Sequence, residues 1–159
     1  MSIYTKKGDS GLTSTLTFKP SKDSLLIEVL GTLDEAVSFL DLAINFSRKK
    51  KIILSLQKTQ TDLSQIGAIL AGRDLLFGQE KIDWLEAEID CLEKRLPPLK
   101  NFVLTSQNKA GAFLQVSRTI IRRAERRAVS LGRKRKIKPA VLSYLNRLSD
   151  YIFLLSLDS

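Results

Sequence analysis

Apolar residues recur every three or four positions along most of the chain, and this spacing predicts helices. A first helix is predicted after Gly31, because Thr32 followed by Glu35 is a capping-box pattern and Leu33, Val37, Leu40 and Ile44 then share one face. Further apolar stripes predict helices over residues 52–70, 82–96, 110–132 and 139–155. The prolines at 97–98 end the third of these five helices, and Pro139 suits the first turn of the last. With almost no strand signal, the pattern predicts an all-α five-helix bundle in one domain, residues 1–159.

The first twenty-odd residues carry no helical period and are rich in Gly, Ser, Thr and Lys. They predict an irregular segment, either an ordered loop or a short extended stretch. Its glycines, hydroxyls and lysines, in YTKKGDSGLTS at 4–14, suit a phosphate chain, because they present backbone N–H groups and ammonium charge. The stretch is not a Walker A motif. On residue types alone, a solvated tail is the favoured interpretation.

Charge and composition narrow the chemistry. The net charge of +9 indicates an anionic partner, with nucleic acid, a membrane surface and a polyphosphate ligand all open. The chain has no histidine, which excludes Ser-His and Cys-His catalysis and a histidine-built zinc site. Cys91 is the only cysteine, and no signal region or membrane-length apolar run is visible, so a cytoplasmic protein is expected.

The stretch RTIIRRAERR, residues 118–127, holds five arginines and one carboxylate. On a helix, Arg118, Arg122 and Arg126 lie four apart in one line, and like charges at this spacing repel. Glu125 is predicted to orient Arg122. A solvated basic face is the usual outcome of such a run. Arginine nevertheless suits bidentate recognition of phosphate or carboxylate better than mere solubility.

The last predicted helix carries a polar pair in YLNRLSDY, residues 144–151. Asn146 and Asp150 are four apart and so share a face, which is either ordinary surface or the lining of a ligand site.

Together and in this order, the motifs resemble the PduO-type ATP:cob(I)alamin adenosyltransferases, the corrinoid adenosyltransferase family. The blocks that carry the resemblance are YTKKGDSGLTS, GTLDEA at 31–36, FVL at 102–104, SRTIIRRAERR at 117–127 and LNRLSDYIF at 145–153. The resemblance implies a five-helix bundle in a homotrimer with sites between subunits. It also implies transfer of the 5′-deoxyadenosyl group of ATP to the cobalt of cob(I)alamin, with release of triphosphate.

The resemblance also implies residue roles. Asp34 and Arg118 match a pair that joins two subunits, Phe102 matches an aromatic residue that closes over the lower face of the corrin, and Arg122 matches a nucleotide-contacting arginine. The implied nucleotide-binding positions are Thr5, Lys6, Lys7, Gly8, Thr13, Ser14, Lys22, Arg122, Arg123, Glu125, Arg126 and Asn146.

This chemistry accounts for the absent histidine, because cob(I)alamin is itself a strong nucleophile and needs no general base. The protein's task is to align the reactants and to stabilise the departing triphosphate, which arginines, a lysine-rich loop and a phosphate-bridging Mg²⁺ suit. The crowded arginines are then expected to be divided between the triphosphate and the carboxylates of Glu125 and Asp34. Two alternatives are a family member that carries or senses the cofactor with weak turnover, and a basic helical protein that binds nucleic acid through RKKK at 48–51 and RKRKIK at 133–138.

Overall fold

The computed structural model describes the whole chain except residues 1–3, 5, 7, 16, 99–105 and 107. Five helices follow one another: α1 (Leu25–Phe46), α2 (Lys50–Leu70), α3 (Gln79–Arg95), α4 (Lys109–Gly132) and α5 (Pro139–Asp158). The predicted all-α five-helix bundle is confirmed, and α3 ends just before the two prolines as the sequence predicts.

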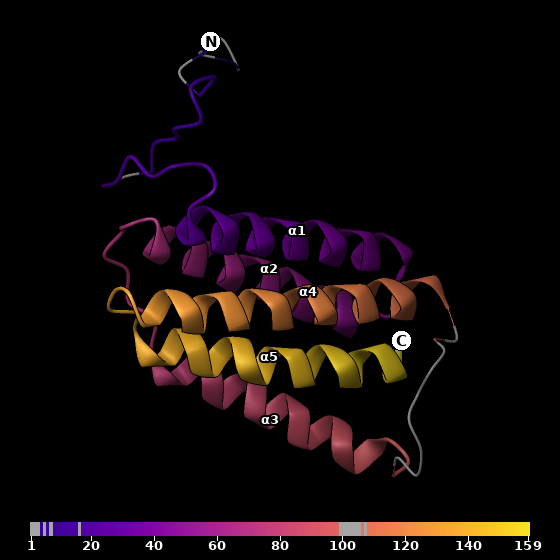
Figure 1. Cartoon of the computed structure of the whole chain (residues 1–159). Coiled ribbons are helices and arrows are strands. Elements are labelled where there is room, and N and C mark those ends of the chain that lie inside the picture. Colours follow the sequence, from indigo (N-terminus) through magenta and orange to yellow (C-terminus); the bar gives the residue numbers. More distant parts are fainter. Residues whose placement is uncertain (1–3, 5, 7, 16, 99–105, 107) are drawn as a thin grey trace.

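The helices pack side by side around one apolar core (Figure 1). α4 packs against α1 and α5, while α2 packs on α1 and α3 on α5. The predicted apolar stripe of α4 is buried, including Ile120, Ile121 and Ala124. The opposite face of α4 is therefore left to carry the charged residues.

The predicted start of the first helix is wrong. α1 begins at Leu25, seven residues earlier than the Thr32 capping box, and Ser24 is its N-cap. Thr32 instead lies within the helix, is 3% exposed and donates its hydroxyl to the Glu28 carbonyl at 2.6 Å. Threonine can bond to the carbonyl four residues earlier, so the same residue type serves inside a helix.

A buried carboxylate joins three helices. Asp62 of α2 is 1% exposed and accepts from Lys81 of α3, from Lys58 at 3.1 Å and from the Tyr144 hydroxyl of α5 at 2.9 Å. Burial raises the pKa of the Asp62 carboxyl, but the hydrogen bonds from Lys81, Lys58 and Tyr144 outweigh it and leave the pKa below its ordinary value. The network fixes α5, which carries Asn146, against α2 and α3.

The N-terminal segment extends beyond the bundle at the end where α1 begins (Figure 1). It doubles back on itself, with a bridge between Leu12 and Ser21 and a hydrogen bond from the Thr13 N–H to the Pro20 carbonyl at 3.0 Å. Its base rests on the bundle at Gly72, where the Thr17 hydroxyl donates to the Ala71 carbonyl at 3.4 Å. Only glycine fits at position 72, because its φ is 108° and a Cβ there would lie 2.0 Å from Thr17 Oγ1. The described part of this segment is an irregular loop with turns and one isolated bridge, so the predicted absence of a helix there is confirmed.

Candidate functional site

Two arginines of α4 are used inside the chain. Arg123 pairs with Glu35 of α1. Arg127 Nε lies 3.0 Å from a Glu28 carboxylate oxygen, and its Nη1 donates to the Thr32 hydroxyl at 2.8 Å. These contacts fasten α4 to α1 and neutralise one line of the arginine run.

The other line points outward. Arg122 and Arg126 are exposed, and neither forms an ion pair with any residue that the structure describes. Arg126 donates only to the Arg122 carbonyl of its own helix, at 3.2 Å. Two guanidinium groups one helical turn apart are thus available to an anion with several oxygens.

Glu125 does not orient Arg122, and that prediction is wrong. Its carboxylate instead accepts from Asn146 Nδ2 of α5 at 3.0 Å. The Asn146 oxygen in turn accepts from Arg147 at 2.9 Å, and Arg147 donates to Glu86 at 3.0 Å. The Asn146 amide thus bridges α4 and α5. Glu125 and Asn146, both predicted site residues, are in contact beside the outward arginines.

Asp34 and Arg118 do not meet within one chain. Arg118 Nε donates to the Gln115 amide oxygen at 2.8 Å, and no carboxylate among the described residues pairs with it. Asp34 is exposed on α1 and lines a groove of about 160 Å³ between α1 and α2. The apolar part of that groove is formed by Leu30, Leu33, Val37 and Leu63.

In the predicted phosphate-binding segment, residues 4–14, the backbone of Gly8 lies close to the Lys22 side chain. A Cβ on Gly8 would lie 3.0 Å from Lys22 Nζ, so the Lys22 ammonium lies beside the Gly8 backbone. Lys6 adopts a φ of 58°, and its carbonyl accepts from the Asp9 N–H at 3.3 Å in a tight turn. Thr13 is half-buried and Ser14 is exposed.

Thr5, Lys7 and Phe102 lie outside the described residues. Between the described loop residues and the outward arginines of α4, the structure shows no hydrogen bond or ion pair. Within the described residues, the two groups of predicted nucleotide-binding residues therefore make no direct polar contact with each other.

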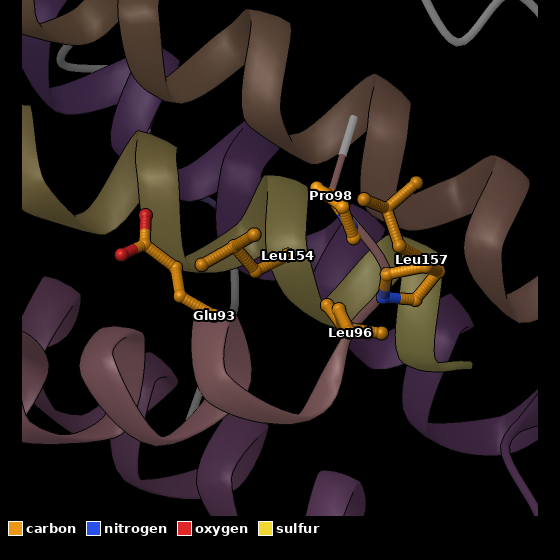
Figure 2. A pocket seen from close by; sticks show the side chains of 6 residues that line it. Glu93, Leu96, Pro98, Leu154 and Leu157 are labelled. Atoms are coloured by element: carbon orange, nitrogen blue, oxygen red, sulfur yellow. The ribbon is translucent and has the colours of Figure 1, made fainter. Parts of the chain in front are cut away.

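A second cavity, of about 230 Å³, lies where α3 ends against the last turns of α5 (Figure 2). Its walls are Leu96, Pro97, Pro98, Leu154 and Leu157, with the Glu93 carboxylate at the edge. Neither this cavity nor the groove at Asp34 is lined by the outward arginines.

Among the described residues, no group of three or more His, Cys, Asp or Glu side chains could hold a metal ion. None of the described helices is long and apolar enough to cross a membrane.

Sequence reasoning missed Glu28, Arg127 and the partnership of Glu35 with Arg123. A signal was present, because Glu28 and Glu35 are seven apart and so share one face of a helix. The shared face was not recognised, because the predicted helix began at Thr32 and so left Glu28 outside it.

The chain is similar to one group of proteins over nearly its whole length. The family model described as cobalamin adenosyltransferase matches residues 3–158. A corrinoid adenosyltransferase of Bacillus subtilis (strain 168) is 40% identical over 161 residues, covering 96% of this chain and 83% of the relative. The corrinoid adenosyltransferase MMAB of Bos taurus is 38% identical over 167 residues, covering 97% and 69%. A solved variant of a PduO-type ATP:corrinoid adenosyltransferase from Lactobacillus reuteri, complexed with cobalamin and ATP, is 32% identical with a TM-score of 0.92, covering 98% of this chain and 89% of that one.

Proposed function

The chain belongs to the cobalamin adenosyltransferase family, and from this premise we propose that it transfers the 5′-deoxyadenosyl group of ATP to the cobalt of cob(I)alamin. The products are adenosylcobalamin and triphosphate, made by a single domain over residues 1–159. The observation that carries the proposal is the outward pair Arg122 and Arg126, which has no counter-charge among the described residues and lies beside the Glu125–Asn146 contact.

The reaction assigns the protein a limited set of tasks. The cobalt electron pair forms the bond to C5′ while the bond from C5′ to the phosphate oxygen breaks, so triphosphate leaves with the negative charge. Arg122 and Arg126 stabilise that charge as it develops, and their fixed positions on α4 avoid reorganisation during the step. Asn146 and Glu125 hold the nucleotide side of the site in register. A general base is unnecessary, in keeping with a chain that has no histidine.

In this proposal Mg²⁺ would arrive with ATP and would neutralise part of the triphosphate charge. Mg²⁺ is commonly held by one or two carboxylates and by substrate phosphates. The phosphates would then supply most of the ligands, and the loop with Lys6, Gly8 and Lys22 would wrap the triphosphate together with Thr5, Lys7, Thr13 and Ser14.

We propose further that the site is shared between copies in a homotrimer. Support comes from two groups left without a counter-charge in the described chain, Asp34 at its groove and Arg118 on α4. A pairing of Asp34 with Arg118 of a neighbouring copy would satisfy both. In a site shared in this way, the loop of one copy and the outward arginines of the next would together contact the triphosphate.

On the corrinoid side, Phe102 is proposed to close over the lower face of the corrin and displace the lower axial ligand. The cytoplasm is the proposed compartment, supported by a single cysteine that can form no disulfide within the chain.

The deciding experiment incubates the chain with ATP, Mg²⁺ and chemically reduced cobalamin and follows the light-sensitive spectrum of adenosylcobalamin. Stoichiometric triphosphate release with repeated turnover supports the proposal. Tight binding of both substrates without turnover would favour a carrier or sensor instead, and absence of both would refute the proposal.

A further inference from the structure

Arg118 is held in the described chain by a neutral partner rather than by a carboxylate. Its Nε donates to a neutral acceptor, the Gln115 amide oxygen, at 2.8 Å. Its guanidinium carbon lies 5.9 Å from the centre of the Phe153 ring. The Nη nitrogens form no hydrogen bond or ion pair with any residue in the described part of the chain.

The orientation of the Gln115 amide is fixed from α5. Ser156 donates its only hydroxyl proton to the Phe153 carbonyl at 2.6 Å, so towards other groups its oxygen can only accept. Gln115 Nε2 donates to that oxygen at 2.7 Å. Since the amide has one nitrogen and one oxygen, its oxygen must face the other way, toward Arg118. The result is a chain of hydrogen bonds in which Arg118 donates to Gln115 and Gln115 donates to Ser156.

We propose that Gln115 and Ser156 are positioning residues for Arg118, and that they turn its Nη edge outward to receive a carboxylate from a second copy of the chain. This inference rests on the shared site proposed above, in which that carboxylate is Asp34.

The neutrality of Gln115 is essential to this device. A carboxylate at position 115 would also accept from Arg118, three residues further along α4, and would form an ion pair inside the helix. The positive charge of Arg118 would then be compensated within its own chain, and its attraction for a carboxylate of another copy would fall. A glutamine fixes the direction of the guanidinium and leaves its charge uncompensated.

A comparison of Gln115→Glu with Gln115→Ala distinguishes the positioning of Arg118 from a role in helix packing alone. If Gln115 only supported the helix, Gln115→Glu would be the milder change, because it keeps the size and the acceptor for Arg118, and the Ser156 hydroxyl can turn from the Phe153 carbonyl to donate to the new carboxylate. Under the proposal, Gln115→Glu keeps a thermal midpoint at or above that of Gln115→Ala, yet weakens self-association by about five- to tenfold, at least as much as Gln115→Ala does. Ser156→Ala, which frees the amide to rotate, should weaken association in the same direction by a smaller factor.

The measurements are sedimentation velocity over a concentration series, thermal unfolding, and separate KM values for ATP and cob(I)alamin. Gln65→Ala is the matched control, since Gln65 is also half-buried and donates to the Leu76 carbonyl at 2.6 Å, far along the chain from Arg118. It should lose no association.

A wild-type chain that associates and turns over, with a Gln115→Glu variant that associates equally well, overturns the positioning role and leaves the proposed function standing. A wild-type chain that stays monomeric and inactive overturns both.

Discussion

Arg122 and Arg127 lie on the same helix, and the structure predicts opposite consequences for their loss. Arg122 is exposed and makes no ion pair in the described chain, whereas Arg127 is bound to Glu28 and to the buried Thr32 hydroxyl. Arg122→Ala should therefore abolish most of the activity with little change in stability. Arg127→Ala should destabilise the fold and retain more of the activity.

The magnitudes follow from these contacts. Removing a preorganised charge contact in an active site commonly lowers the rate about 10²–10³-fold, or roughly 2.7–4 kcal/mol of transition-state stabilisation. An exposed side chain without partners changes the free energy of unfolding by only about 0.5 kcal/mol. Arg127 is different, because it loses a half-exposed ion pair worth about 0–1 kcal/mol and leaves a buried hydroxyl without a donor, about 1 kcal/mol more. A total of about 1–2 kcal/mol corresponds to a fall in Tm of roughly 2–8 °C for a chain of this length.

The assay is adenosylcobalamin formation under limiting ATP, with kcat/KM compared beside thermal unfolding of each variant. Arg133→Ala serves as the charge control, because Arg133 is exposed just beyond α4 and its loss lowers the net charge equally. Arg122→Lys should also be poor, since a point charge cannot replace a guanidinium fork. Near-normal kcat/KM in Arg122→Ala, or equal losses of activity in Arg122→Ala and Arg133→Ala, would refute the reasoning.

Two further predictions concern the core and the subunit contact. Asp62→Asn should lower the free energy of unfolding at pH 7 by about 3–5 kcal/mol, because Lys81 loses its counter-charge in a largely buried site. Since the folded-state pKa of Asp62 lies below its ordinary 3.8, this difference should persist above about pH 4 and fade as the pH falls through the folded-state pKa, which urea unfolding between pH 3 and 7 measures. Equal stability at pH 7 would contradict a stabilising role for the network. Asp34→Arg and Arg118→Asp should each weaken self-association and activity, and the double variant should recover part of both in sedimentation and turnover assays; a monomeric wild type that still turns over would rule out the shared site.

Helix content and order could be predicted from the sequence, because apolar periodicity reports directly on burial. α2, α3, α4 and α5 lie within a few residues of their predicted bounds. The start of α1 could not be predicted from the sequence. Thr32 and Glu35 have the spacing of a capping box, but the helix begins earlier, at Leu25. Local capping patterns describe only the first turn, whereas the packing of Leu26 and Val29 in the core decides where the helix begins.

The partners of charged residues were harder to predict than the residues themselves. Glu125 was expected to serve Arg122 on the basis of helical spacing, but Asn146 reaches it from a neighbouring helix. Long side chains choose partners across helix interfaces, and these interfaces depend on the packing angles of the bundle, which periodicity does not fix. The family resemblance implied that Asn146 belongs to the nucleotide site, and the structure shows its contact with Glu125.

The arginine run is tolerable because its two lines face different surroundings. A spacing of four residues keeps Arg123 above Arg127 on the side of α1, where Glu35 and Glu28 neutralise them. The same spacing keeps Arg122 above Arg126 on the outward side, where the described chain supplies no counter-charge. Repulsion within the outward line destabilises the free protein slightly, and a bound triphosphate would relieve it. One helix thus uses paired arginines to hold its place in the bundle, and under the proposed function its unpaired arginines would bind the anion, so the charge that weakens the isolated helix would contribute to binding.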